Sequence, residues 1–178
     1  MFILTSNLHK AREYQEFGIE VRLGPEVDEV LGSIDEVITY KILNSVSFTL
    51  VEDTVLEIEG HELVETKFKI KSIPNNSDAC WITSLGYHDT MYIYVYRGII
   101  KGKIVESIFE HESSFEPCFI PIGADITLYE LRQKGLKEKF SARRLAVEAY
   151  RNSNPVFCKK VSNIPKWEGK YQSKRSGY

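Results

Sequence analysis

Hydrophobic and polar positions change from a strand pattern to a helix pattern over the first 18 residues. Residues 2–4 form a short apolar run, and Ala11, Tyr14 and Phe17 then recur at helical spacing until Gly18, a residue suited to end a helix. The turn between the two elements is polar. The pattern predicts a strand, a polar turn and a helix, in that order.

A second helix pattern begins at Ser33. Ser33 and Glu36 have the spacing of a capping box, and apolar residues recur on one helical face from position 34 to 42. Residues 48–51 follow as an apolar strand pattern that runs into an acidic pair. We therefore expect a second helix and then a short strand that ends at this pair.

Strand patterns dominate the middle of the chain. Residues 80–87 and 91–97 predict two paired antiparallel strands. Residues 99–108 extend the second strand, with bends or bulges expected at Gly98 and Gly102. Two further helix patterns follow toward the C terminus.

Length and composition limit the class of protein. The chain has 178 residues, 43% of them hydrophobic, which is enough for one substantial core. No apolar run approaches the roughly 20 residues that span a bilayer, and the start lacks the pattern of a secretory signal. Cys80, Cys118 and Cys158 lack the paired spacing of a zinc site or a disulfide framework. We expect a cytoplasmic protein without membrane contact, whose cysteines are structural.

Charge is distributed unevenly along the chain. Residues 159–178 carry six basic side chains against one acid, Glu168, so this tail has a charge of +5 and residues 1–158 have −7, which together give the net −2. The tail could contact nucleic acid or an acidic partner. The alternative, which we favour, is a solvated extension with Trp167 docked on the body. We divide the chain into a domain over residues 1–158 and a basic C-terminal extension over 159–178.

The polar turn after the first strand is suited to a phosphate group. Backbone N–H groups at a helix start lack intrahelical partners and lie at the positive end of the helix dipole. Thr5 and Asn7 could add hydrogen-bond donors, and Lys10 a positive charge. The same pattern also fits an ordinary capped helix, so the turn alone leaves both interpretations open.

Lys41 lies on the same helical face as the apolar residues. Because burial of a lone ammonium is costly, this side chain should either reach the surface or meet an anion in a cleft. Glu52 and Asp53 offer the oxygen ligands that Mg²⁺ uses together with substrate phosphates. Glu29 or Glu26 could supply a second carboxylate. These residues favour a site for Mg²⁺ and phosphate.

Five short motifs follow one another in a recognisable order. They are Thr5-x-Asn7-x-x-Lys10, an acidic stretch before the helix that bears Lys41, Val51-Glu52-Asp53-Thr54, Phe115-Glu116-Pro117-Cys118-Phe119-x-Pro121 and Ser141-x-Arg143. In this order they resemble the inosine/xanthosine triphosphate pyrophosphatases, the HAM1-like family. The resemblance spans residues 1 to about 150.

The resemblance implies both a fold and a reaction. The implied fold is α/β, with an elongated mixed central β-sheet flanked by helices, two lobes with a cleft between them, and a homodimer. The implied reaction is Mg²⁺-dependent hydrolysis of a nucleoside triphosphate to the monophosphate and pyrophosphate. Aberrant purine nucleotides such as ITP, dITP and XTP are the expected substrates.

The resemblance also implies roles for individual residues. Asp53 would bind the metal or orient the attacking water, with Glu52 and Lys10 as further catalytic residues. Glu29 best matches the second metal ligand, and Glu26 remains an alternative. Substrate contacts would come, for the triphosphate, from Thr5, Ser6, Asn7, Lys10, Lys41 and Lys69, and, at the base-binding end, from Phe115, Glu116, Lys137, Ser141 and Arg143.

The base-binding end departs from the family pattern. Ser113 stands where the family has a stacking aromatic residue, and Glu116 is longer by one methylene than the family's aspartate. Ala142 replaces a histidine that donates a hydrogen bond to a 6-oxo purine. Since such contacts set base selection, two alternatives stay open: the same reaction on a different or modified base, and a non-catalytic nucleotide-binding protein with the same fold.

Overall fold

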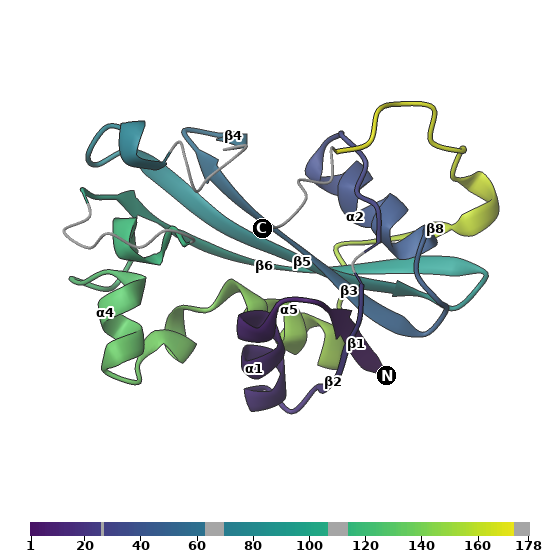
Figure 1. The fold of residues 1–178 in the computed structure, drawn as a ribbon, viewed down its shortest axis with the longest axis horizontal. Helices are drawn as coiled ribbons and strands as arrows, with labels where there is room; N and C mark the ends of the chain where they lie inside the picture. The colour runs from purple at the N-terminus through teal and green to yellow at the C-terminus, as the bar shows by residue number, and fades with distance from the viewer. Residues whose placement is uncertain (26, 63–69, 107–113, 173–178) are drawn as a thin grey trace. The chain divides into compact units, whose positions relative to one another are not determined.

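A computed structural model describes residues 1–25, 27–62, 70–106 and 114–172 (Figure 1). The helices are α1 (Leu8–Glu16), α2 (Ile34–Leu43), α4 (Leu128–Gln133) and α5 (Ala142–Arg151). The strands are β1 (Phe2–Thr5), β2 (Glu20–Leu23), β3 (Thr49–Ile58), β4 (His61–Glu62), β5 (Asp78–His88), β6 (Tyr92–Ile104), β7 (Phe119–Pro121) and β8 (Phe157–Lys160). Short 3₁₀ turns cover Ile70–Ser72, Glu116–Cys118, Lys137–Phe140 and Val161–Asn163.

The described strands form one mixed sheet. Its order is β2-β1-β3-β5-β6-β7, with β4 paired to β3 and β8 paired to β6. β1 is parallel to both β2 and β3, whereas β6 is antiparallel to β7 and β8. The α/β class with a mixed central sheet is therefore confirmed.

The chain divides into two compact units. Unit 1 comprises residues 1–53, 84–97 and 146–178, and unit 2 comprises residues 54–83 and 98–145. Each unit has its own buried hydrophobic residues. The core of unit 2 surrounds Trp81 and Phe119, which are both almost fully buried.

Unit 1 buries both faces of its strands. Leu50 of β3 packs in one group with Tyr14 of α1 and Ala146 of α5, whereas its neighbour Val51 packs in another group with Ile38 of α2. Adjacent residues of a strand point to opposite faces, so α1 and α5 cover one face and α2 covers the other. Figure 1 shows these helices on the two sides of the strands.

β3 is longer than the sequence pattern indicated. The expected end of this strand at Glu52 and Asp53 is wrong, because the strand continues to Ile58. Leu56 and Ile58 anchor this continuation in the core of unit 2. Glu52 and Asp53 therefore project from the interior of a strand.

β6 runs without a break from Tyr92 to Ile104, so the second strand does extend through Gly98 and Gly102, and the bends or bulges expected at these glycines stay a prediction. Gly102 has a role in packing. A Cβ atom at this position would meet the carbonyl oxygen of Ile120 and the ring of Phe119. Glycine therefore permits the close approach of β7 to β6.

The segment that leads to residue 172 does not simply extend into solvent. β8 pairs with β6 and spans the boundary expected between residues 158 and 159. Trp167 packs against the ring of Tyr40 of α2, as the docking alternative expected. The division into domains stays a prediction.

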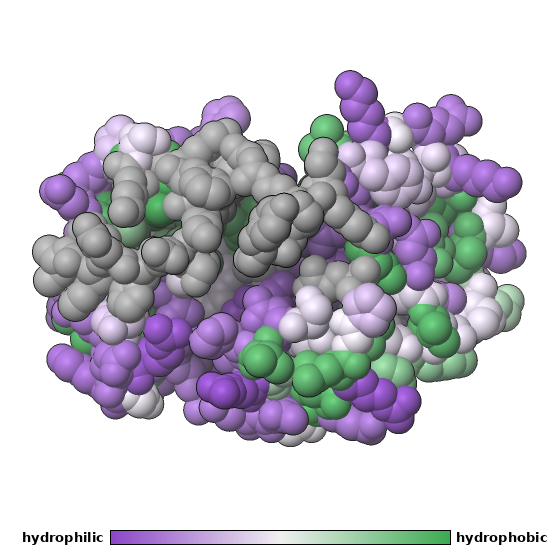
Figure 2. Space-filling view, in the orientation of Figure 1, coloured by the Kyte–Doolittle hydropathy of each residue, from purple (hydrophilic) through white to green (hydrophobic). Residues whose placement is uncertain are grey.

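Hydrophobic residues on the face drawn in Figure 2 form small groups separated by hydrophilic ones. Among the described residues, the helices are too short or too polar to cross a membrane.

Candidate functional site

The turn between β1 and α1 is a capped helix start. The Thr5 hydroxyl, at the end of β1, accepts a hydrogen bond from the backbone N–H of Asn7 at 3.1 Å. The Asn7 side-chain oxygen accepts from the N–H groups of His9 at 2.9 Å and Lys10 at 3.2 Å. The capped-helix interpretation thus describes this turn, and Asn7 already binds two of the N–H groups that a phosphate could use. Ser6 is exposed.

Lys10 extends from α1 to β3. Its ammonium group lies 3.4 Å from a carboxylate oxygen of Glu52, whose side chain is 3% exposed. A carboxylate is buried at low cost only when a cation or hydrogen bonds compensate its charge. Lys10 therefore stabilises Glu52 inside the sheet.

Lys41 forms the second ion pair of this region. Its ammonium contacts the Glu29 carboxylate, and the Lys41 side chain is 7% exposed. Burial acts to lower the pKa of Lys41, but Glu29, Asp53 and Glu52 raise it, and the net pKa lies above the ordinary value. Lys41 is therefore charged at neutral pH. Of the two outcomes expected from its place on an apolar helical face, the structure shows the buried contact with an anion.

Asp53 lies in the field of both lysines. Burial raises the pKa of its carboxyl group, Lys41 and Lys10 act in the opposite direction, and Glu29 and Glu52 raise it further. The net pKa lies above the ordinary value of 3.8. The sequence placed Asp53 at the end of a strand, whereas the structure couples it to these charges from the strand interior.

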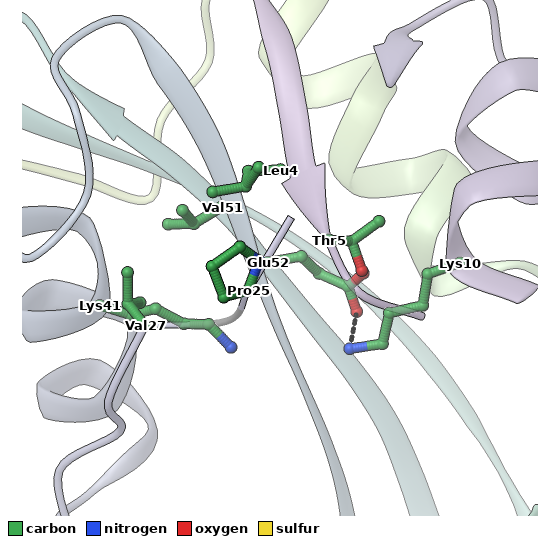
Figure 3. A pocket seen from close by; sticks show the side chains of 8 residues that line it. All are labelled: Leu4, Thr5, Lys10, Pro25, Val27, Lys41, Val51 and Glu52. Carbon is green, nitrogen blue, oxygen red and sulfur yellow. Dashed lines mark ion pairs between the residues drawn. The ribbon is translucent and has the colours of Figure 1, made fainter. Parts of the chain in front are cut away.

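Lys10, Lys41 and Glu52 line a small pocket within unit 1, whereas Glu29 and Asp53 are not among its lining residues. In Figure 3 the ammonium groups of Lys10 and Lys41 point toward one another from α1 and α2, and the Glu52 carboxylate lies next to the Lys10 ammonium. The residues that line the pocket are Leu4, Thr5, Lys10, Pro25, Val27, Lys41, Val51 and Glu52. The pocket thus combines two cations with a partly apolar wall.

The donor set is suited to one divalent cation shared with a ligand. Glu29, Glu52 and Asp53 interact electrostatically with Lys10 and Lys41, so three carboxylates face two ammonium groups. A cation would offset the excess negative charge and the cost of burying ionised Asp53. Within the described residues, no His, Cys, Asp or Glu side chains form a three-ligand group. This chemistry fits Mg²⁺, which commonly uses one or two carboxylates together with phosphate oxygens.

Unit 2 holds a second cluster of charged residues. Glu116 is buried, and its carboxylate accepts a hydrogen bond from Lys137 at 2.8 Å and pairs with Arg132 at 3.0 Å. The Lys137 side chain is only 10% exposed. The two predicted residues Glu116 and Lys137 are therefore brought together.

Trp81 lies at the centre of the remaining base-end residues. The Arg143 guanidinium lies 5.5 Å from the centre of the Trp81 ring, and Phe115 meets that ring edge-on at 5.7 Å. Arg143 also donates to the Thr54 hydroxyl at 3.4 Å. Ser141 accepts a hydrogen bond from the N–H of Arg144 at 3.2 Å and so caps α5.

Sequence reasoning missed two members of the unit 2 cluster, Trp81 and Arg132. Trp81 is part of an apolar strand pattern, which indicates a core residue, and Arg132 belongs to a short helix in which it reads as an ordinary surface charge. No local signal distinguishes either of them. Lys69, Glu26 and Ser113 lie outside the described residues.

Comparison with known proteins identifies the family. A model of the Ham1 family matches residues 60–153, which is more than half of the chain. The chain belongs to the Ham1 family. The Ham1 match includes Glu116, Lys137 and Arg143, whereas Thr5 to Asp53 precede it.

A solved structure shares the fold. The Staphylococcus aureus Ham1 protein is 17% identical in sequence, with a TM-score of 0.60, over 86% of this chain and 97% of that chain. A search of curated proteins found no match. At the level of the family, Ham1 membership places the chain among ITPase-like nucleotide pyrophosphatases, which are generally dependent on a divalent metal.

Proposed function

We propose that this chain hydrolyses nucleoside triphosphates to nucleoside monophosphates and pyrophosphate with Mg²⁺. The observation that carries the proposal is the unit 1 pocket, where Lys10 and Lys41 converge beside Glu52, together with the electrostatic interaction of both lysines with Asp53, in a member of the Ham1 family. Two buried or partly buried cations are suited to a triphosphate chain, because the negative charge of its oxygens otherwise hinders the approach of a nucleophile to phosphorus.

The proposed roles combine the contacts within the unit 1 pocket with the resemblance to the family. Lys10 and Lys41 would bind phosphate oxygens, with Thr5, Ser6, Asn7 and Lys69 as further contacts to the triphosphate. Glu29 and Asp53 would hold Mg²⁺, which when bound would neutralise charge on the phosphate oxygens.

Asp53 is the favoured group to orient the attacking water. Its raised pKa brings the carboxyl group closer to the range in which it can accept a proton near neutral pH. Glu52 is already engaged by Lys10 at 3.4 Å, so its proposed contribution is to hold Lys10 in place.

For the base, we propose recognition by Glu116, Lys137, Ser141 and Arg143, with Phe115 as a further contact. Aberrant purines such as those of ITP, dITP and XTP are the first candidates. Ala142 is fully buried in the core of unit 2 and offers no side-chain donor, which favours a different or modified base as the second candidate. The homodimer and the cytoplasmic location stay predictions.

A panel of triphosphates tests the proposal. Hypoxanthine, xanthine and ordinary or modified base triphosphates are assayed for pyrophosphate release, with and without Mg²⁺. We expect selective turnover that requires Mg²⁺ and that falls about 100-fold or more in Asp53→Asn. An inactive wild-type protein across the panel, or an Asp53→Asn variant with near-normal turnover, would contradict the assignment.

A further inference from the structure

Residues 164–172 form an extended segment of unit 1 that we call the strap. It follows β8 and the turn Val161–Asn163, where Val161 and Ile164 pack against the buried group that includes Ile38 of α2. The Ham1 match ends at residue 153, so the strap lies beyond the part of the chain that the family comparison covers.

The strap pairs with the loop that precedes α2. Tyr171 forms an antiparallel bridge with Val30, which is fully buried. The backbone N–H of Gln172 donates to the carbonyl of Glu29 at 2.8 Å. The side-chain amide of Gln172 donates to the carbonyl of Val30 at 3.1 Å. One residue of the strap therefore holds two successive carbonyl groups of the loop.

The strap also contacts α2. Trp167 packs against Tyr40 with ring centres 5.0 Å apart and ring planes tilted by 56°, and the Tyr40 hydroxyl donates to the carbonyl of Pro165 at 2.9 Å. The indole N–H of Trp167 donates to the carbonyl of Lys170 at 3.1 Å, and the same carbonyl accepts from the N–H of Leu31 at 2.8 Å. The helix contact and the loop contact are thus linked by hydrogen bonds within the strap.

Both contacts adjoin the ion pair of the unit 1 pocket. Tyr40 precedes Lys41 in α2, and Gln172 binds the backbone at Glu29. Because Val30 points into the core, fixing its backbone also fixes the direction in which the neighbouring Glu29 side chain leaves the loop. Without such restraint, a loop carboxylate would lose conformational freedom each time it adopted the geometry of the site.

We propose that the strap is a positioning element for the phosphate and metal site, and that Gln172 is its principal positioning residue. This inference rests on the proposed function, in which Glu29 is a ligand for Mg²⁺. Gln172 holds Glu29 against Lys41 before substrate arrives, which reduces the entropy lost on binding. Loss of its side-chain amide should therefore weaken Mg²⁺ binding more than it slows the chemical step.

The first experiment measures the coupling without using activity. Full-length Gln172→Ala and Trp167→Ala are compared with Lys166→Ala, an exposed residue of the same strap, for the acylation rate of Lys41 by an amine-reactive reagent. Peptide mass spectrometry supplies the rates, with exposed Lys134 as the internal reference. We expect Lys41 labelling to rise about three- to tenfold in the first two variants, the range that one lost hydrogen bond covers, and to stay at the wild-type rate in Lys166→Ala.

The second experiment uses pyrophosphate release with the best triphosphate of the panel. In Gln172→Ala, the Mg²⁺ concentration for half-maximal rate should rise about three- to tenfold, while kcat at saturating Mg²⁺ stays within about twofold. Unchanged Lys41 labelling would overturn the strap proposal, whatever the activity. Raised labelling with an unchanged Mg²⁺ dependence would also overturn it. Raised labelling in the two variants, when the wild-type protein turns over no triphosphate, would support the coupling and refute the proposed function instead.

Discussion

Replacement of Lys41 by methionine separates the structural from the catalytic value of its buried charge. Methionine retains most of the apolar stem, so the change removes chiefly the ammonium and its contact with Glu29. A hydrogen bond between charged groups contributes about 1.5–3 kcal/mol net. Because the Glu29 side chain is 27% exposed and can be rehydrated, we expect the free energy of unfolding to fall by about 1–2 kcal/mol, around and somewhat below the lower end of that range.

The expected effect of Lys41→Met on turnover is larger. Removal of a positioned electrostatic group lowers rates about 100-fold, or roughly 2.7 kcal/mol. A domain with a stability of about 5–15 kcal/mol stays almost entirely folded after a loss of 1–2 kcal/mol. The fall in pyrophosphate release should therefore exceed any loss of folded protein. Since Lys41 also lowers the pKa of Asp53, the acid side of the pH–rate profile should move to higher pH.

Arg97→Met is the matched control. Arg97 lies in the same unit and pairs with Asp35 at 2.7 Å, with the Arg97 side chain 18% exposed. We expect chemical denaturation to show a comparable loss of stability in the two variants, and steady-state assays to show near-normal turnover in Arg97→Met alone. Equal loss of activity in both, or less than a tenfold loss in Lys41→Met, would refute the reasoning.

Three further predictions concern stability. The backbone N–H and then the hydroxyl of Ser33 hold the pKa of Glu36 below 4.5, so the stability that its carboxylate contributes is present above pH 4.5 and is lost as pH falls through the lowered pKa. Glu36→Gln should therefore lower the melting temperature at about pH 7, and the difference from the wild-type protein should shrink as the pH is lowered below 4.5; a difference that does not change with pH would argue against this contribution. Lys137→Met leaves the buried Glu116 carboxylate paired with Arg132 and should lower the free energy of unfolding in urea by about 3 kcal/mol. This loss should be smaller when Glu116→Gln is added, and an equal loss in the double variant would argue against the pair. Gly102→Ala should lower the free energy of unfolding by about 1–3 kcal/mol, because the Cβ of the alanine meets the Ile120 carbonyl and the Phe119 ring. An unchanged melting temperature would exclude this clash.

Elements with strong apolar periodicity could be predicted from the sequence. The face of α2 was evident from its spacing and its capping box, which the structure confirms between Ser33 and Glu36. β2 was missed because its residues Glu20–Leu23 are mostly exposed and show little alternation. The length of β3 was underestimated because two adjacent acidic residues after an apolar run, here Glu52 and Asp53, are typical of the end of a strand and not of its buried interior.

The candidate site was predictable only in part, because several of its contacts join residues that are far apart in the sequence. Lys41 was conspicuous as a cation on an apolar face, and Glu29 was one of two possible acids. The pairing of Lys10 with Glu52 joins residues far apart in the sequence, so no local spacing indicates it. The positions of Trp81 and Arg132 likewise depend on tertiary packing.

Identifying the phosphorus atom that water attacks tests the central claim most directly. The wild-type protein is supplied with Mg²⁺, its best nucleoside triphosphate and water labelled with heavy oxygen, and the products are separated and examined by phosphorus NMR and mass spectrometry. Attack at the α-phosphorus predicts the label in the nucleoside monophosphate and unlabelled pyrophosphate. Label in orthophosphate, with a nucleoside diphosphate as the other product, would contradict the account.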